Sequence, residues 1–458
     1  MQGNDFSRKP LKELLGLEIN GCRCGRTHRV PTREASLRHG AMNLLPEFVD
    51  RWMSTGPLIL VVDGNTWTAA GEKAVRLLES AGKTVSPHFV DQKYQPVHAD
   101  KQTVADLVAL IERKTTAGII GVGSGTINDI CKTAATATGK TLITVATAAS
   151  MNGYTSAISA LTVDGVKITE PCHPPIAVIA DPEVLASAPQ SMSAAGFGDL
   201  LSKNASTADW ILSNALLGDY FCGIPVAVAE EAVATSIRQA DIIRANKPEG
   251  LSVLIDALLR SGIAMVLAGS SAPASGGEHL ISHLWDMTAH WTGRTPALHG
   301  QQTGVTTLIS LALYQKILSL EPEEIRRKDL KPEFPTIAAM ESELRSVFRD
   351  IAASVLPHAR AKFLDQNGLA ARRQLILSRW DKIRQAVSAA VISPALSRQH
   401  LQTAGAIYDI DGLGITGEEL QFAYTYARWI RNRYTVLDLA ADIGMLNEWR
   451  EEVLASVK

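Results

Sequence analysis

Residues 118–135 read GIIGVGSGTINDICKTAA, and this stretch decides the fold of the chain. Its first part is an apolar run typical of a buried strand, and its second part repeats apolar residues at helical spacing. Three glycines, Gly121, Gly123 and Gly125, separate the two parts. A strand that turns directly into a helix is the unit of a parallel α/β sheet. The glycines then either allow a tight turn alone or let backbone amides approach a phosphate group.

The segments around this turn alternate between strand and helix. Residues 58–62 form an apolar run that ends at Asp63, residues 68–82 and 104–117 have helical periodicity, and residues 140–150 again resemble a strand. Residues 159–182 predict a hairpin followed by a strand, and from about residue 186 onward helix follows helix. We therefore predict an α/β, Rossmann-like nucleotide-binding domain over residues 1–185 and an all-α domain over residues 186–458.

The composition excludes several classes of protein. The 458 residues are 46% hydrophobic and 20% charged, which suits two folded domains, and a net charge of −2 offers no basic field for nucleic acid. The chain has five cysteines, a small and odd number that does not suit a disulfide framework. The polar N-terminus lacks the apolar core of a signal peptide, and no apolar run approaches the roughly 18 residues that span a bilayer. We expect a cytoplasmic protein that binds neither nucleic acid nor a membrane.

The glycine turn is a candidate nucleotide site. Its G-x-G-x-G spacing differs from the usual G-x-G-x-x-G fingerprint, but a strand precedes it and a helix follows, so helix N–H groups face the turn. Ser124 and Thr126 add hydroxyl donors. Asp63, at the end of an earlier strand, is a candidate acceptor for a ribose hydroxyl. A turn or cap aspartate is the more common role for such a residue taken alone.

The helical half contains candidate metal ligands. Asp199 lies in AGFGDLLSK, His279 and His283 lie four apart in EHLISHLWD, and His299 lies in PALHGQQTG. Carboxylate and imidazole groups suit zinc or a similar divalent ion, and a catalytic site uses three of them. The usual role of a buried histidine is a plain hydrogen bond, and the spacing alone does not select which histidines join Asp199.

Together these motifs resemble a known family. In chain order they are DGNT, GVGSGTINDICK, TAASMNGYTSA, GVKIT, GFGDLLSK, GGEHLISH and LHGQQTG. The set is similar to the glycerol-1-phosphate dehydrogenases, within the superfamily of iron-containing alcohol dehydrogenases, glycerol dehydrogenase and dehydroquinate synthase. The resemblance runs from about residue 15 to beyond residue 310. It implies a dehydroquinate synthase-like fold with the active site in the cleft between the two domains.

The resemblance also implies roles for individual residues. It implies that Asp199, His279 and His299 hold one divalent metal ion (Zn, Ni or Fe), that His283 relays a proton, and that Lys203 and Lys167 face a substrate phosphate. The cofactor is NAD or NADP. The nucleotide contacts we expect are Asp63, Asn65, Gly121, Gly123, Ser124, Gly125, Thr126, Asp129, Thr144 and Thr147. The substrate contacts we expect are Asn152, Ser156, Lys167 and Lys203, with His283 and Lys203 as the catalytic residues.

The implied reaction is the interconversion of dihydroxyacetone phosphate and sn-glycerol 1-phosphate, a step of phospholipid metabolism, by a homodimer. Three alternatives stay open. A polyol or glycerol dehydrogenase would act on substrates without phosphate. A sugar-phosphate cyclase would use NAD without net turnover, although D-x-x-x-K at Asp199 and Lys203 replaces the E-x-x-K of that family. A catalytically silent nucleotide-binding regulatory protein would do no chemistry.

Two residues depart from the family pattern. Asn152 stands where aspartate is usual, and Gln301 stands where glutamate is common, next but one to a metal ligand. Each keeps the hydrogen-bonding shape and loses a charge. Near the N-terminus, Cys22, Cys24 and His28 offer three metal ligands, but the C-x-C spacing is tighter than that of a zinc knuckle. The resemblance places a surface hairpin there, which we favour over a metal site.

Overall fold

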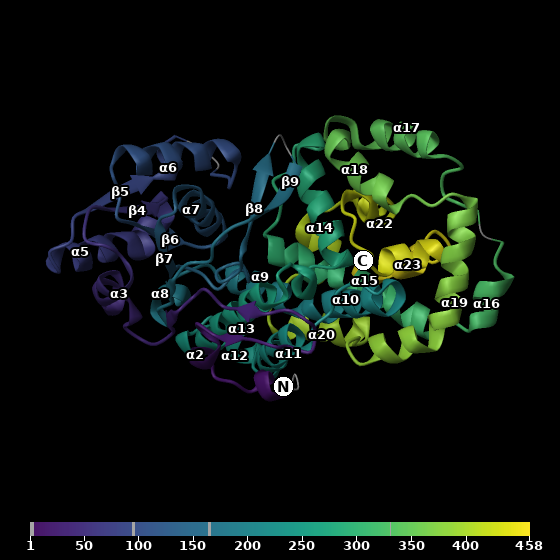
Figure 1. Cartoon of the computed structure of the whole chain (residues 1–458), viewed down its shortest axis with the longest axis horizontal. Coiled ribbons are helices and arrows are strands. Elements are labelled where there is room, and N and C mark those ends of the chain that lie inside the picture. The colour runs from purple at the N-terminus through teal and green to yellow at the C-terminus, as the bar shows by residue number, and fades with distance from the viewer. Residues whose placement is uncertain (1–3, 94–96, 164–165, 330) are drawn as a thin grey trace.

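The computed structural model describes residues 4–93, 97–163, 166–329 and 331–458. It has an α/β lobe, at the left of Figure 1, and a helical lobe, at the right. The α/β lobe is built on a six-stranded parallel sheet with the strand order β3-β10-β7-β6-β4-β5. Its strands are β3 (Glu34–Ser36), β4 (Leu58–Val62), β5 (Val85–Phe89), β6 (Gly118–Gly123), β7 (Thr141–Ala146) and β10 (Ala177–Ile179).

Helices cover both faces of this sheet, as expected for a Rossmann-like domain. On one face, α3 (Leu45–Trp52) and α5 (Glu72–Ser80) pack against side chains such as Leu60 and Ile120. On the other face, α6 (Lys101–Arg113) and α7 (Gly125–Thr138) pack against Ile59, Ile119 and their neighbours. Successive residues of one strand point to opposite faces, so a strand buried on both sides is apolar throughout. The short helices α4 (Gly64–Thr66) and α8 (Pro182–Ala186) complete the lobe.

The strand order reverses between β4 and β6. The chain runs from β4 outward to β5 and then returns to the other side of β4 to form β6, with Val61 opposite Gly121. Ligands of open α/β sheets bind at the carboxyl ends of the strands on either side of such a reversal. Asp63 directly follows β4 and Ser124 directly follows β6, so the predicted nucleotide residues flank this position.

A two-stranded hairpin stands between the two lobes (Figure 1). It consists of β8 (Ile158–Val163) and β9 (Val166–Pro171), paired antiparallel, which confirms the predicted hairpin. The turn at residues 164–165 lies outside the described residues. Lys167 on β9 reaches the helical lobe, where its Nζ lies 2.8 Å from Oδ2 of Asp286.

The N-terminal segment belongs with the helical lobe. It forms α1 (Asn4–Ser7), α2 (Leu11–Leu14), β1 (Glu18–Ile19) and β2 (His28–Arg29). Phe6, Leu11 and Leu14 are buried in the same apolar cluster as the C-terminal helices. The boundary predicted at residue 185 stays a prediction, and short apolar segments such as α1 and α2 carry no sign in the sequence of which core they join.

The helical lobe contains the α-helices from α9 onward, and no strand occurs among its described residues after β10. Its helices are α9 (Gln190–Leu201), α10 (Lys203–Leu217), α11 (Gly223–Arg238), α12 (Ala240–Arg244), α13 (Pro248–Ala268), α14 (Gly277–Thr288), α15 (His299–Ser319), α16 (Pro322–Arg327), α17 (Ile337–Phe348), α18 (Ala352–Lys362), α19 (Gln366–Ser388), α20 (Pro394–Thr403), α21 (Ile410–Leu413), α22 (Gly417–Tyr426), α23 (Val436–Asp442) and α24 (Arg450–Leu454). Of the described helices, α13 alone is long and apolar enough to cross a membrane, but most of it is buried inside the lobe, and it contains Glu249, Asp256 and Arg260.

Glycines bring α9 and α15 into backbone contact. A Cβ atom on Gly198 of α9 would lie 2.3 Å from the carbonyl oxygen of Gly300, and one on Gly300 of α15 would lie 1.9 Å from that of Ala195. Any larger residue at these positions would force the two helices apart. Asp199 follows Gly198 and His299 precedes Gly300, so this contact sets the separation of two predicted metal ligands.

Replacement of Gly198 by alanine should therefore destabilise the protein by about 1–3 kcal/mol, the usual cost of overpacking a core. The loss should appear as a lower urea midpoint with an unchanged slope. Gly417→Ala is the matched control, because a Cβ added there would meet no atom within 4 Å and its φ is not in the left-handed region. Equal stability of the two variants would contradict the proposed helix contact.

Candidate active site

Three side chains from three helices of the helical lobe converge. Asp199 lies near the end of α9, His279 lies in the first turn of α14, and His299 begins α15. One oxygen or nitrogen atom from each lies within 4.8 Å of the other two. The structure thus selects His279 and His299 as the partners of Asp199, which the spacing of the histidines alone does not do.

Hydrogen bonds from two directions hold the Asp199 carboxylate, which has no solvent exposure. The backbone N–H of Asn152 donates to Oδ2 at 2.9 Å, and its side-chain Nδ2 donates to Oδ1 at 3.1 Å. Lys203 Nζ lies 3.0 Å from Oδ1. Burial acts to raise the pKa of Asp199, but the ammonium group of Lys203 outweighs it, so the pKa falls.

The contact with Asn152 explains the first departure from the family pattern. An amide at this position donates a hydrogen bond to the carboxylate of Asp199. An aspartate would place a second negative charge there and would need a cation between the two groups. Asn152 is therefore a positioning residue for Asp199 in the structure.

Glu278 orients the imidazole of His279. Its Oε1 lies 2.8 Å from Nδ1 of His279, and Nε2 of His279 lies 3.9 Å from Oδ1 of Asp199. A carboxylate on one ring nitrogen fixes the tautomer and directs the other nitrogen at a metal ion. Burial raises the pKa of Glu278 to about 7, so a cation at His279 would favour its ionised form. Glu278 was not among the residues predicted from the sequence, although its position next to His279 in GGEHLISH was a visible signal.

The second departure, Gln301, lies at the start of α15. Its Oε1 accepts a hydrogen bond from the backbone N–H of Leu298 at 3.3 Å, which caps the start of α15. The carboxylate that supports a ligand is Glu278. The loss of charge at Gln301 therefore leaves the hydrogen bond to His279 intact.

His283 lies beside the ligand cluster. Its ring centroid is 5.8 Å from that of His279 and 5.6 Å from that of His299. Burial lowers the pKa of all three histidines, and their mutual proximity lowers it further at His279 and His283. Neutral imidazole is the form that binds metals. Nδ1 of His283 is buried without a hydrogen-bond partner among the described residues.

These residues fit a divalent cation. One buried ionised carboxylate and two neutral imidazoles form an O, N, N donor set, the kind that catalytic zinc sites combine with one open position. Among the described residues, Nδ1 of His299 and Nδ1 of His283 are buried polar atoms without a hydrogen-bond partner. Such atoms need a partner, and a bound ion or substrate supplies one.

A loop connects this cluster to the glycine turn. Lys132 on α7 is fully buried, and its Nζ donates to the carbonyl of Gly153 at 2.9 Å and to Oγ of Ser156 at 3.1 Å. Asn128, one turn earlier on the same face, lies 3.4 Å from the same carbonyl. The helix that begins at the glycine turn therefore holds the loop whose Asn152 holds Asp199. Lys132 was not predicted from the sequence.

The glycines of the turn have separate roles. A Cβ on Gly121 would lie 3.0 Å from Sγ of Cys131, and one on Gly123 would lie 2.5 Å from Cβ of Ile127, so both are required for close packing of α7 on the sheet. Gly125 begins α7, and a Cβ added there would lie 3.6 Å from the nearest non-local atom. Of the three, Gly125 leaves the most space for a ligand at the helix N-terminus.

The other predicted nucleotide residues are partly engaged within the protein. Asp63 caps α4 by accepting from the N–H of Thr66 at 2.8 Å. Thr144 donates to Asn128 at 3.1 Å, and Asp129 pairs with Lys132 at 3.1 Å. The backbone N–H of Thr147 donates to the carbonyl of Gly123 at 3.2 Å. Exposed or half-exposed side chains near the strand ends are Asn65, Ser124 and Thr126.

The predicted substrate residues differ in exposure and in hydrogen bonding. Lys203 is almost fully buried, and its ammonium group donates to the carbonyl of Asp199 at 2.7 Å, to Ser202 and to Ala274, as well as to the Asp199 carboxylate. These acceptors use all three of its N–H bonds. Lys167 remains 26% exposed beside Asp286, and Ser156 is buried against Lys132.

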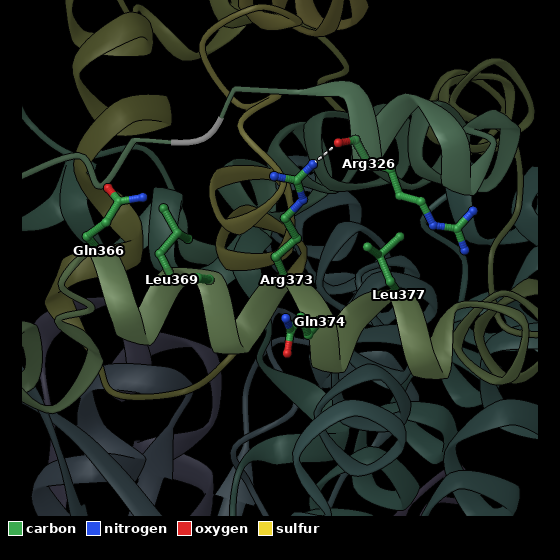
Figure 2. Close-up of a pocket in the computed structure, with 7 residues that line it drawn as sticks. Arg326, Gln366, Leu369, Arg373, Gln374 and Leu377 are labelled. Carbon is green, nitrogen blue, oxygen red and sulfur yellow. Dashed lines mark hydrogen bonds between the residues drawn. The ribbon is translucent and has the colours of Figure 1, made fainter.

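A surface cavity elsewhere lacks this chemistry. It lies between α16 and α19, has a volume of 290 Å³ and is lined by Arg326, Gln366, Leu369 and Arg373, among others. Figure 2 shows Arg373 bonded to the backbone oxygen of Arg326. The residues that line the cavity include none of the ligand cluster and no histidine, aspartate or glutamate.

Comparison with known proteins identifies the class. Residues 36–189 match the family model of iron-containing alcohol dehydrogenases. A solved structure of a probable glycerol dehydrogenase from Sinorhizobium meliloti matches 92% of the chain and 98% of its own length, with a TM-score of 0.60 and 16% identity. Glycerol dehydrogenase from Schizosaccharomyces pombe has a TM-score of 0.59, matches 93% of the chain and 91% of its own length, and is 18% identical. The predicted fold is therefore confirmed.

Closer sequence relatives identify the family. A glycerol-1-phosphate dehydrogenase (NAD(P)+) from Halalkalibacterium halodurans is 37% identical over 296 residues, which are 64% of this chain and 74% of the relative. One from Pyrococcus furiosus is 34% identical over 282 residues, which are 62% of this chain and 78% of the relative. The chain belongs to the glycerol-1-phosphate dehydrogenase family. Membership supports a nicotinamide nucleotide and a metal ion as its cofactors.

Replacement of Glu278 by glutamine should weaken metal binding at the cluster by about 10–100-fold, the usual effect of losing a carboxylate behind a ligating histidine. Chelator competition on metal-free protein measures the affinity, and the same titration of His279→Ala protein gives the background from any other site. Glu230→Gln, exposed on α11, is the matched control. Unchanged affinity in Glu278→Gln would contradict the role given to this carboxylate.

Proposed function

We propose that this chain is a metal-dependent, NAD(P)-linked dehydrogenase that interconverts dihydroxyacetone phosphate and sn-glycerol 1-phosphate. The observation that carries the proposal is the convergence of Asp199, His279 and His299, linked by the Asn152 loop to the glycine turn of the sheet. The relatives described above are named for this activity. We further propose that the protein is cytoplasmic and homodimeric and that its metal ion is zinc, nickel or iron.

In this proposal the metal ion and the nicotinamide nucleotide have different roles. A divalent ion held by Asp199, His279 and His299 supplies Lewis-acid polarisation of the substrate oxygen, and the nicotinamide supplies or accepts the hydride. The protein's own contribution is placement. We assign the nucleotide to the carboxyl ends of β4 and β6, where the strand order reverses and the N-terminus of α7 points its N–H groups outward.

We assign proton transfer at the substrate oxygen to His283. Its neutral imidazole lies beside the ligand cluster, and its buried Nδ1 has no partner among the described residues. A neutral imidazole accepts a proton in the oxidation direction and, once protonated, returns it in the reduction direction. Lys203 acts through Asp199 as a positioning residue, because its N–H bonds are committed to protein oxygens.

We assign the substrate phosphate to the cations on the hairpin side of the cluster. Lys167 on β9 is partly exposed, and the guanidinium of Arg431 lies beside it, donating to the backbone oxygen of Lys167 at 2.6 Å. Burial opposes the charge on Lys167, but attraction to Asp286 outweighs it, so the pKa of the ammonium is raised. Arg431 was not predicted from the sequence.

The test is oxidation of NADH and, separately, NADPH with dihydroxyacetone phosphate and with dihydroxyacetone, after chelation and again after zinc, nickel or iron is restored. We expect metal-dependent turnover with the phosphate ester only. Turnover with both substrates would favour a polyol dehydrogenase. Turnover with neither, in protein that retains its metal, would contradict the proposed activity and favour a silent regulatory protein or a cyclase.

Replacement of Lys167 by alanine separates phosphate binding from the rest of the reaction. A hydrogen bond between charged groups contributes about 1.5–3 kcal/mol, so KM for dihydroxyacetone phosphate should rise about tenfold or more with a smaller change in kcat. The exposed Lys101→Ala should leave KM unchanged. If Lys167→Ala and Lys101→Ala have the same KM, Lys167 does not contact the phosphate.

A further inference from the structure

A second group of metal-binding side chains lies where the N-terminal hairpin meets the helical lobe. Cys22 and Cys24 lie in the connection between β1 and β2, and His28 begins β2. The fourth member, Cys222, immediately precedes α11 and lies 200 residues after Cys22 in the chain. One ligand atom from each of the four residues lies within 4.8 Å of the others. The group shares no residue with the Asp199 cluster.

The distances match the edges of a zinc tetrahedron. Sγ of Cys22 and Sγ of Cys222 are 3.9 Å apart, and Nε2 of His28 is 3.3 Å from Sγ of Cys24 and 3.7 Å from Sγ of Cys222. With Zn–S bonds of about 2.3 Å and Zn–N bonds of about 2.0 Å, tetrahedral geometry requires S···S edges of about 3.8 Å and S···N edges of about 3.5 Å. A disulfide would require sulfurs about 2.05 Å apart, and all five cysteines are free.

The histidine is held in the tautomer that zinc requires. His28 is 2% exposed, and its Nδ1 lies 2.5 Å from the backbone oxygen of Leu267, near the end of α13. A carbonyl oxygen only accepts, so Nδ1 carries the proton and Nε2 presents its lone pair to the three sulfurs. Metal-ligating histidines use their second nitrogen in this way.

The backbone turn brings the first two ligands together. Gly25 adopts a positive φ of 81°, and its N–H donates to the carbonyl of Cys22 at 2.9 Å, which closes the turn between Cys22 and Cys24. Zinc binds the thiolate form of cysteine, so binding of the ion displaces the thiol protons.

We propose that Cys22, Cys24, His28 and Cys222 form a structural Cys₃His zinc site that fastens the N-terminal hairpin to the helical lobe. Protein ligands fill all four positions, so the site is closed to substrate. The ion links the hairpin to the segment between α10 and α11, and through His28 it reaches α13. On α13, Gly262 packs against the backbone oxygen of Asn152. This helix therefore contacts the N-terminal hairpin through His28 and also contacts the loop whose Asn152 binds Asp199. Binding releases the thiol protons and changes no oxidation state.

The test is elemental analysis of protein purified under reducing conditions without chelators. Wild-type protein should contain about one zinc ion per protomer more than Cys24→Ser or Cys222→Ser protein. Cys172→Ser, a buried thiol outside the cluster, is the matched control and should keep the full zinc content. His279→Ala should lose the other metal ion and keep the cysteine-bound one, which separates this proposal from the proposed activity.

A second measurement uses the wild-type protein, so it can be made even if the serine variants fail to fold. Wild-type protein loaded with cobalt in place of zinc should show thiolate-to-cobalt charge-transfer absorption in the near ultraviolet. The Asp199 cluster has no sulfur and cannot produce this band. Absence of the band in cobalt-loaded protein, or a disulfide between Cys22 and Cys222 in the purified reduced protein, would overturn the proposal.

Discussion

The buried carboxylate of Asp199 is the constraint on which the rest of the site depends. An isolated charge in a protein interior costs several kcal/mol, so it persists only where donors and cations surround it. Asn152 supplies two N–H groups from the α/β lobe, Lys203 supplies an ammonium group from the helical lobe, and the neighbouring histidines complete the surroundings. Because these partners come from both lobes, the same carboxylate fixes the relative positions of the loop, the helices and the metal ligands.

Much of the fold was predictable because its signals are local. The apolar runs at β4, β6 and β7 are buried on both faces, and their lengths and boundaries follow from the residues that interrupt them, such as Asp63 and Ser124. The packing of the N-terminal segment against the helical lobe was not predictable from such local signals. Phe6 and Leu14 are apolar residues in short elements, and only the packed structure shows that they join the helical core.

The family resemblance implied Asp199, His279 and His299 as metal ligands, and the structure brings these three side chains together. The residues that support them were not found from the sequence. Glu278 was signalled only by its place beside His279, with which it forms a hydrogen bond. Lys132 and Arg431 contact backbone oxygens far away in the chain, and the spacing of the sequence does not reveal such contacts. The glycines at 198 and 300 are a further case, because their role is the approach of two helix backbones. Cys222 is the clearest example, since it completes a group whose other members lie near residue 25.

The most direct test of the central claim is anomalous diffraction from crystals of the zinc-loaded protein, recorded on both sides of the zinc absorption edge. The account predicts an anomalous peak bounded by the carboxylate of Asp199 and the imidazoles of His279 and His299, with Asn152 still bonded to Asp199. Two results would contradict this metal site. One is the absence of an anomalous peak at this position in catalytically active crystals, and the other is a zinc ion there that is bound by other side chains.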